Sequence, residues 1–175
     1  MYLADYHMHS KYSFDGSEEL DTICQTAIRR GLSEIAITDH MDIYTGLPYD
    51  EQMNFDVMGH LTYPLRYMFE RNHLRLDLKP YEDKFRQLFK NLTEKGRGIE
   101  LNVSGYYKAM QDAMPPMSIL KLYRECSGEI ITIGSDAHKA EYIGFYQKEA
   151  HEMLQEAGFR YLTVFDHRKP EFIKL

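Results

Sequence analysis

Short apolar runs alternate with amphipathic segments along the whole chain. This alternation is typical of βα units that build a parallel sheet, so the pattern predicts an α/β protein. The expected strands cover residues 3–6, 34–38, 55–58, 98–103, 130–133 and 161–165. The strand at 130–133 is the clearest, because it is β-branched throughout and lies between glycines.

Helices are expected between these strands. The first begins after Ser17, a good N-cap followed by two glutamates that suit the helix dipole, and it stops at Gly31. A second runs over residues 81–95, with its apolar positions on one face. A third follows the two prolines at 115–116, and a fourth ends at Gly158.

Metal-ligand side chains recur at the carboxyl ends of the expected strands. The first strand ends in His7-Met8-His9, and alternation along a strand directs both rings to the same side. Carboxyl ends of strands are where α/β folds build their sites. Five imidazoles and two carboxylates there are hard to explain as core packing, because unpaired buried polar groups are costly. The full candidate set is His7, His9, Asp15, His40, His60, Asp136 and His138.

Composition narrows the class of protein. The length of 175 residues and 43% hydrophobic content predict one globular domain over residues 1–175. The net charge of −6 disfavours a nucleic-acid partner, and no apolar run is long enough to cross a membrane. Two cysteines far apart form no disulfide framework, so we expect a cytoplasmic protein.

Three further histidines fit ordinary surface positions. His73 lies in a charged stretch and His151 lies on a polar side of a helix, so we expect both to be exposed to solvent. His167 follows the last strand, and solvent exposure is again the expectation.

Several motifs together resemble the polymerase-and-histidinol-phosphatase (PHP) superfamily. They are His7-Met-His9, Thr38-Asp-His40, Gly59-His60 and Gly134-Ser-Asp136-Ala-His138, in that order. Three more stretches, residues 55–61, 99–105 and 168–170, look like the histidinol-phosphatase branch. The resemblance implies a distorted (β/α)7-type barrel with a centre of two to three divalent ions (Zn, Mn or Fe) that hydrolyses phosphate esters.

The resemblance also implies roles for residues. His7, His9 and Asp136 look like ligands of one ion; Asp15, His40 and His138 look like ligands of another, and His60 of a third. Asp136 and His138 are thereby expected to act in catalysis. Arg66 is a candidate phosphate-binding residue, although an ordinary surface arginine is an equally good interpretation.

The middle of the chain departs from the family pattern. Only 19 residues separate His40 from His60, whereas the family has two further βα units there, which supply a bridging glutamate and another histidine. A single βαβ unit needs about 30 residues. Glu51 is the one glutamate in this interval. Three explanations are open: a shortened relative with an incomplete barrel and site, a sheet closed by a homo-oligomer, or a sequence that lacks a segment of the whole protein.

Two functions from different classes follow. The first is a metal-dependent phosphatase whose small phosphorylated substrate is histidinol phosphate. Gly105-Tyr106-Tyr107-Lys108, where the family often has glycine-leucine-arginine, weakens that substrate assignment, although Lys108 offers a positive charge. The second is a shortened metal-binding module with a structural or partner-binding role. A nuclease is a weaker third option, because the chain has no basic stripe.

Overall fold

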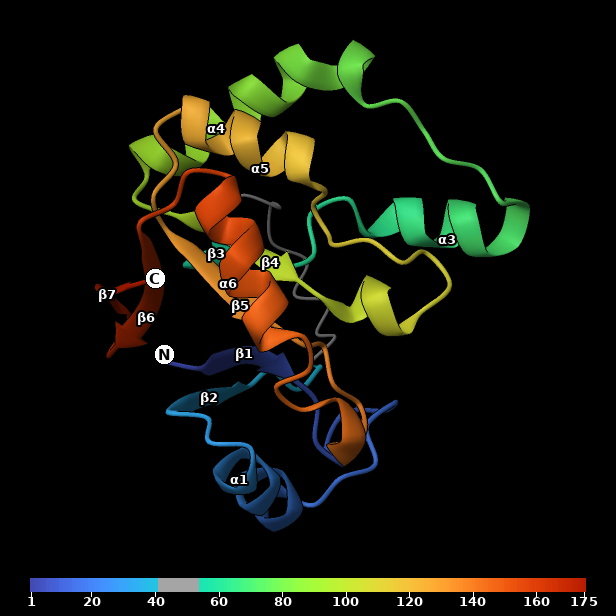
Figure 1. The fold of residues 1–175 in the computed structure, drawn as a ribbon, viewed down its shortest axis with the longest axis vertical. Helices are drawn as coiled ribbons and strands as arrows, with labels where there is room; N and C mark the ends of the chain where they lie inside the picture. Colours follow the sequence, from blue (N-terminus) through green and yellow to red (C-terminus); the bar gives the residue numbers. More distant parts are fainter. Residues whose placement is uncertain (41–53) are drawn as a thin grey trace.

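A computed structural model describes residues 1–40 and 54–175 (Figure 1). Glu51 therefore lies outside the described residues. The strands are β1 (Ala4–Met8), β2 (Glu34–Ile37), β3 (Val57–Met58), β4 (Gly98–Asn102), β5 (Ile131–Gly134), β6 (Tyr161–Asp166) and β7 (Lys169–Lys174). The α-helices are α1 (Leu20–Arg29), α3 (Tyr63–Asn72), α4 (Glu82–Glu94), α5 (Met117–Glu125) and α6 (Gln147–Glu156). Short 3-10 turns cover Lys79–Tyr81, Ser104–Tyr107 and Ala140–Tyr142.

Five strands run parallel and place their carboxyl ends at one edge. β1 pairs with β2, and β3, β4 and β5 pair in that order. Two main-chain hydrogen bonds join the carboxyl end of β5 to that of β1. The N–H of Asp136 donates to the carbonyl of His7 at 2.7 Å, and the N–H of His9 donates to the carbonyl of Ala137 at 2.9 Å. The α/β class predicted from the sequence is confirmed.

The apolar core packs helices against the central strands. β4 and β5 are buried along their whole length, as expected for central parallel strands. Phe89 of α4, Tyr123 of α5 and Leu154 of α6 pack in the larger core cluster. A smaller cluster joins Met8 of β1 to Ile23 of α1. Figure 1 shows α4 and α5 together at one end of the molecule and α1 at the other, with the strands between them.

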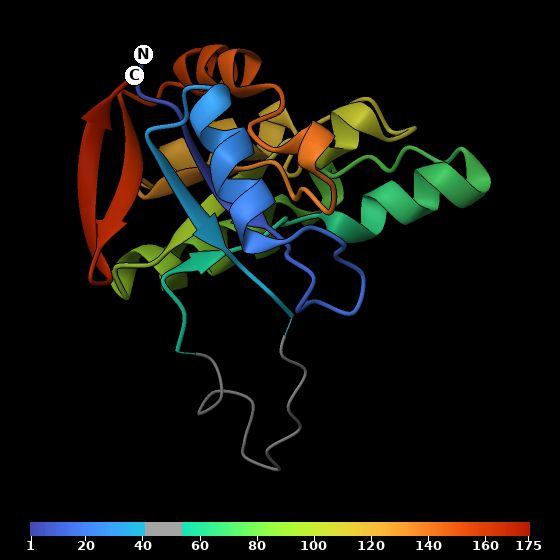
Figure 2. The same cartoon turned by 90° about the horizontal axis from the view of Figure 1, so that it is seen from below.

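The antiparallel strand β7 was not predicted. It forms a hairpin with β6, which Figure 2 shows as a separate ribbon at one side of the molecule. The turn consists of His167 and Arg168, whose φ angles are 47° and 65°. Two positive φ angles are typical of a tight hairpin turn, but asparagine and glycine usually fill these positions. The sequence therefore carries no recognisable hairpin signal here.

The outer edges of β2 and β3 carry no neighbouring strand within residues 1–40 and 54–175. A cavity of about 420 Å³ lies between these two strands, and its lining includes Ala36 and Thr38 on one side and Val57 and Gly59 on the other. His7 and Glu100 form part of its floor. The described strands therefore leave the sheet open at the point in the chain where the family pattern is shortened.

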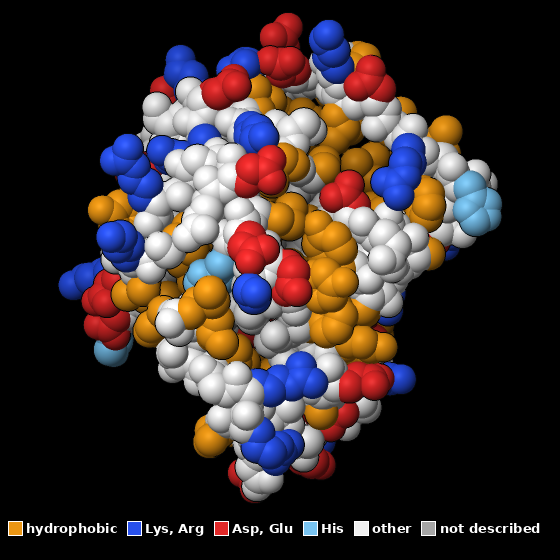
Figure 3. Space-filling view, in the orientation of Figure 1, with side chains coloured by type: hydrophobic (Ala, Val, Ile, Leu, Met, Phe, Trp, Pro, Cys, Tyr) orange, Lys and Arg blue, Asp and Glu red, His pale blue; other side chains and the backbone are white. Residues whose placement is uncertain are grey.

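The surface is mixed in charge. On the face drawn in Figure 3, lysine and arginine side chains are interspersed with acidic ones and do not gather into a stripe. Within the described part of the chain, no helix has both the length and the apolar character needed to span a membrane.

Candidate metal centre

Three side chains at the carboxyl ends of β1 and β5 converge on one point. Asp136 follows β5, and its Oδ1 atom lies 3.2 Å from Nε2 of His9 and 3.5 Å from Nε2 of His7. The two imidazole Nε2 atoms are 3.1 Å apart. The alternation of β1 places the two rings on the same side, as predicted, and the neighbouring strand adds the carboxylate. One ligand atom from each residue lies within 4.8 Å of the others, a spacing suited to one cation.

A second group forms around Asp15 and shares His9 with the first. Oδ2 of Asp15 lies 3.0 Å from Nε2 of His138 and 3.7 Å from Nε2 of His40. The His9 ring stacks on both imidazoles, with centroid distances of 4.5 Å to His40 and 4.2 Å to His138. The structure thus brings together both sets of residues that the sequence proposed as ligands, and adds His9 to the second.

The three inner imidazoles are oriented by partners on their Nδ1 atoms. His7 Nδ1 lies 2.7 Å from Oε1 of Glu100, and His138 Nδ1 lies 2.9 Å from the carbonyl oxygen of Asp136. A carbonyl only accepts, so Nδ1 of His138 carries the hydrogen and Nε2 keeps its lone pair. Histidines that bind metals are held this way, with one nitrogen bonded to the protein and the other directed at the ion.

His9 is held through Ser13. The Ser13 hydroxyl donates to Oδ1 of Asp39 at 2.9 Å, so its oxygen accepts from His9 Nδ1, which is 3.3 Å away. Asp39 also accepts from the main-chain N–H and the hydroxyl of Ser10, both at 2.6 Å. Asp39 therefore anchors the loop that fixes the His9 ring and directs its Nε2 atom towards Asp136.

The inner carboxylates stay ionised despite their burial. Burial raises the pKa of Asp136, but its hydrogen bond to His9 and the nearby charges of His7 and His138 outweigh this and hold the pKa well below its usual range. The pKa of Glu100 is also lowered, because His7 outweighs the effect of burial. Burial lowers the pKa of His7, yet Glu100 and Asp136 together raise it to about 9. Asp136 and Glu100 therefore supply negative charge at the carboxyl ends of the strands.

The donor set fits a divalent transition metal. Imidazole nitrogens and carboxylate oxygens together suit zinc, iron or manganese. The close approach of the Nε2 atoms of His7 and His9, both beside Asp136, is the arrangement that a shared cation would stabilise.

His60 lies outside both ligand groups. Its ring centroid is 5.2 Å from that of His7 and 4.6 Å from that of Tyr63, and burial lowers its pKa. Its main-chain N–H donates to Oε2 of Glu100 at 2.5 Å, in a turn where the φ of His60 is 28°. The structure places His60 at the rim of the first group, and its role as a ligand of a third ion stays a prediction.

Arg66 is buried beside the first group, so the interpretation as a surface arginine is wrong. It lies on α3 and is 8% exposed, and its Nη1 atom is 4.0 Å from Oδ2 of Asp136. Its guanidinium lies over the rings of Tyr63 and Tyr67, and Nη2 donates to the Tyr63 hydroxyl at 2.7 Å. The Nε–H of Arg66 has no hydrogen-bond partner within the described residues. Nε lies 3.9 Å from Oε1 of Glu70, whereas Nη1 is the atom that faces the metal-ligand cluster.

Sequence reasoning missed Glu100 as a site residue. It is the one charged residue in the buried run Gly98–Asn102, and charged side chains are seldom fully buried unless they are paired. That signal could have identified it. Lys108 is exposed, and its Nζ lies over the ring of Tyr107. The Tyr107 hydroxyl in turn donates to the carbonyls of Ser135 and Asp136, which ties Lys108 to the edge of the site.

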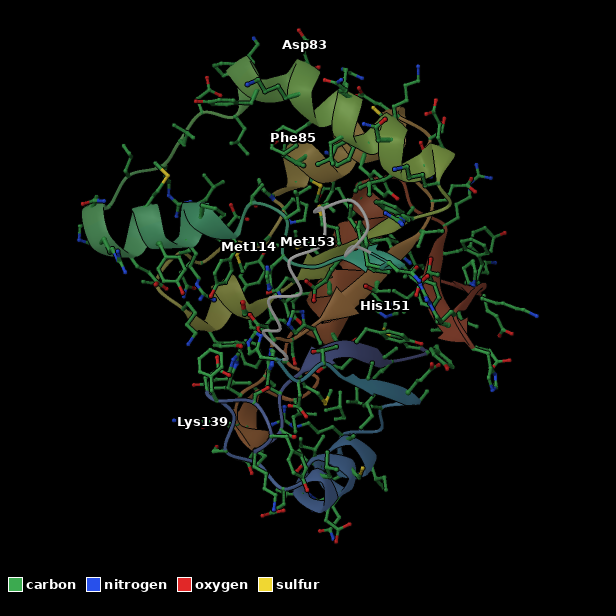
Figure 4. The ribbon with its side chains drawn as sticks, turned by 180° about the vertical axis from the view of Figure 1, so that it is seen from behind. Asp83, Phe85, Met114, Lys139, His151 and Met153 are labelled. Carbon is green, nitrogen blue, oxygen red and sulfur yellow. The ribbon has the colours of Figure 1, made fainter. Side chains whose placement is uncertain are left out.

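His73 and His167 are exposed, as predicted, but His151 is not. It is 4% exposed, on the same buried side of α6 as Ala150 and Leu154. In Figure 4 it lies away from the rim of the molecule, where the outline of the strands falls in this view. The polar neighbours of His151 in the sequence belong to the opposite side of the helix, which is why its position was misjudged.

Known proteins resemble this chain over most of its length. The family model described as PHP domain matches residues 5–54. A probable histidinol-phosphatase of Thermotoga maritima is 24% identical over 240 positions, which cover 99% of this chain and 100% of that protein. Because this chain has 175 residues, the alignment leaves about 65 positions without a counterpart here. A probable histidinol-phosphatase of Deinococcus radiodurans is 28% identical over 66% of this chain and 40% of its own length.

Solved structures share the fold. The histidinol phosphate phosphatase of Lactococcus lactis, determined with zinc, L-histidinol and phosphate, has a TM-score of 0.70 at 14% identity and covers 97% of this chain and 98% of its own. A putative histidinol phosphatase of Listeria monocytogenes has a TM-score of 0.68 at 12% identity and covers 83% of this chain and 99% of its own. In its motifs, in the family match over residues 5–54 and in these relatives, the chain is similar to the histidinol-phosphatase-like branch of the PHP superfamily.

Proposed function

We propose that this chain is a metal-dependent phosphatase that hydrolyses histidinol phosphate to histidinol, a step of histidine biosynthesis. The observation that carries the proposal is the pair of ligand groups that share His9, with the buried Arg66 guanidinium 4.0 Å from Asp136. The names of the relatives support the choice of substrate.

Each ligand group would hold one divalent ion. His7, His9 and Asp136 would bind one zinc, manganese or iron ion, and Asp15, His40 and His138 would bind another, with His9 between them. His60 would bind a third. Such ions lower the pKa of a bound water and neutralise the charge of phosphate oxygens.

The chain's own residues would bind and orient the phosphate. Arg66 would offer the Nη1 side of its guanidinium, which faces Asp136, to a phosphate oxygen, and the guanidinium is held in place by Tyr63 and Tyr67. Arginine suits this role because its planar donors match phosphate oxygens. Asp136 stays ionised next to His9, and the Nδ1 bond of His138 to the Asp136 carbonyl keeps the His138 ring directed at Asp15. These contacts would fix the catalytic side chains before substrate arrives.

The proposed architecture is a (β/α)7-type PHP barrel that is open between β2 and β3. Within residues 1–40 and 54–175 no strand pairs with the outer edges of β2 and β3, and the cavity between them is where two further βα units would fit; both observations support this architecture. The roughly 65 positions of the Thermotoga maritima relative that have no counterpart here are enough for two such units.

The gap in the sheet between β2 and β3 also favours a second candidate function. This is a shortened PHP module that binds metal but hydrolyses phosphate esters slowly or not at all. The cavity reaches His7 and Glu100 from the side where the missing units would lie. Without ligands from those units the two ions would be held less rigidly, and a misplacement of about 1 Å can cost about 100-fold in rate.

A side-by-side assay tests both candidates. The 175-residue chain is compared with a version that carries the corresponding middle segment of the Thermotoga maritima relative. Each is loaded with Mn²⁺ and then with Zn²⁺ and assayed on histidinol phosphate. If the longer version hydrolyses histidinol phosphate and the shorter one does so at least 100-fold more slowly, the 175-residue chain is the shortened metal-binding module. Comparable rates in both versions would support the phosphatase. Turnover by neither, or no loss of turnover in an Asp136→Asn variant, would contradict the phosphatase assignment.

A further inference from the structure

Glu100 is a deeply buried carboxylate beside the first ligand group. It lies in the middle of β4, and its side chain is 3% exposed. Oε1 accepts from Nδ1 of His7 at 2.7 Å, and Oε2 accepts from the main-chain N–H of His60 at 2.5 Å. The Asn102 side-chain amide donates to Oε2 at 3.2 Å. One carboxylate thus joins the side chain of one proposed ligand to the main chain of another.

A buried carboxylate at this position needs a reason. Removing an ionised group from water is costly unless it is paired and hydrogen-bonded. No lysine or arginine of the described residues forms an ion pair with Glu100, and its one charged partner is the His7 imidazole. A well-packed apolar side chain would serve the core of β4 at least as well. The carboxylate is therefore better explained by what it does to His7 than by stability.

We propose that Glu100 is a positioning residue of the metal centre, which fixes His7 through its Nδ1 atom and the His60 turn through its main-chain N–H. The inference rests on the proposed function, in that it takes the His7 group to bind metal. The contact with Glu100 keeps a hydrogen on Nδ1, so the neutral His7 ring that binds a metal would direct its Nε2 lone pair to the point where Nε2 of His9 and Oδ1 of Asp136 converge. The carboxylate acts on the ligand and not on the ion.

The contacts of Glu100 fit a residue that positions His7 better than a residue that binds the metal ion itself. Both Glu100 oxygens are already occupied by three donors, and Glu100 belongs to neither ligand group. It contacts the Nδ1 side of the His7 ring, whereas the cation position lies on the Nε2 side. Partners of this kind raise the basicity of the ligand they hold, and their loss commonly weakens metal binding 10- to 100-fold.

The test measures zinc binding of the purified chain in competition with a chromophoric chelator. In Glu100→Gln the zinc affinity is expected to fall by about 10- to 100-fold while the number of bound ions stays the same. The matched control is Glu94→Gln, an exposed glutamate of α4 that pairs with Lys90, and its affinity should equal that of the unchanged chain. If Glu100→Gln does not fold, Glu100→Asp keeps the charge but is too short to reach both His7 and His60, so the same loss is expected.

A double-mutant cycle with His7→Asn shows whether Glu100 acts through His7. In the His7→Asn background, Glu100→Gln should cause little further loss of affinity, because the group that it positions is gone. Loss of one whole zinc equivalent in Glu100→Gln alone would mean that Glu100 is a ligand and would overturn the proposal, as would unchanged affinity or additive losses in the cycle. A different result would contradict the phosphatase assignment alone: the unchanged chain binds zinc, but neither it nor the longer version hydrolyses histidinol phosphate. If the unchanged chain binds no zinc, both fail.

Discussion

Gly134 lies directly against Glu100, so closely that a methyl group on Gly134 would overlap the Oε1 atom of that carboxylate. The same methyl group would lie 2.5 Å from Cβ of His7. The last residue of β5 must therefore be glycine for the His7–Glu100 pair to keep its position between the strands. The glycine belongs to the Gly134-Ser-Asp136 motif, so one short stretch supplies both a proposed ligand and the space that its neighbours need.

Gly134→Ala is expected to weaken metal binding and lower stability together. The added carbon displaces Glu100 and His7, and overpacking a close-packed interior costs about 1–3 kcal/mol. Zinc titration and urea unfolding measure the two effects. Gly59→Ala is the matched control, because its added carbon would lie 3.5 Å from Oε2 of Glu100, an ordinary contact. Equal zinc affinity in the two variants would contradict the role assigned to Gly134.

Metal removal should destabilise the chain. The ligands come from distant parts of the sequence, so the unfolded chain lacks the site and binding adds to the free energy of unfolding. At a free zinc concentration 100-fold above Kd the gain is about 2.7 kcal/mol per site. Thermal unfolding with zinc and with a chelator measures it, and elemental analysis should find at least two ions per chain. His138→Ala should lose part of the zinc-dependent shift while His73→Ala keeps it; equal shifts in both would argue against His138 as a ligand.

Arg66→Ala should lower kcat/KM for a phosphate monoester by about 10- to 100-fold, because a hydrogen bond to a charged group contributes about 1.5–3 kcal/mol. Arg66→Lys should recover little of this, since lysine lacks the planar donors. The exposed Arg29 of α1 provides the control Arg29→Ala. Zinc stoichiometry should be unchanged in both arginine variants. An Arg66→Ala variant with full kcat/KM would remove Arg66 from phosphate binding.

Much of the site could be predicted from the sequence because local periodicity places ligands. His7 and His9 are two residues apart on a strand, and Asp136 and His138 follow the clearest strand, so their position at one edge follows from the βα pattern. Local periodicity could not predict that His9 belongs to both ligand groups. It depends on how β1 and β5 approach each other across the sheet, which is a tertiary relationship.

The residues that support the ligands were harder to find. Glu100 and Asp39 belong to quoted motifs, yet their roles become visible only when the atoms they contact are known. The hairpin of β6 and β7 escaped notice because its turn uses His167 and Arg168 in place of the usual asparagine and glycine. Conversely, the sequence predicts an exposed His151 and leaves Arg66 open between phosphate binding and the surface, because burial of both depends on how their helices pack.

His151 should make the chain less stable in mild acid. Burial, with a smaller contribution from the charged amino terminus, lowers its pKa in the folded state below the usual 6.5. Its Nε2 atom has no hydrogen-bond partner within the described residues, so nothing there compensates a charge on the ring. Between pH 6.5 and the lower folded pKa the unfolded chain binds a proton that the folded chain does not. The stability due to neutral His151 is therefore fully present above about pH 6.5 and is lost as the pH falls through this window.

The measurement is urea unfolding at pH values from about 7.5 to 5, with a chelator present so that metal release does not contribute. His151→Leu should show a shallower fall in the free energy of unfolding than the unchanged chain, by at most about 1.4 kcal/mol per pH unit. His73→Gln serves as the control, because His73 is exposed and its replacement should leave the slope unchanged. If His151→Leu and the unchanged chain lose stability in parallel over this range, His151 is protonated in the folded protein and its burial does not keep it neutral.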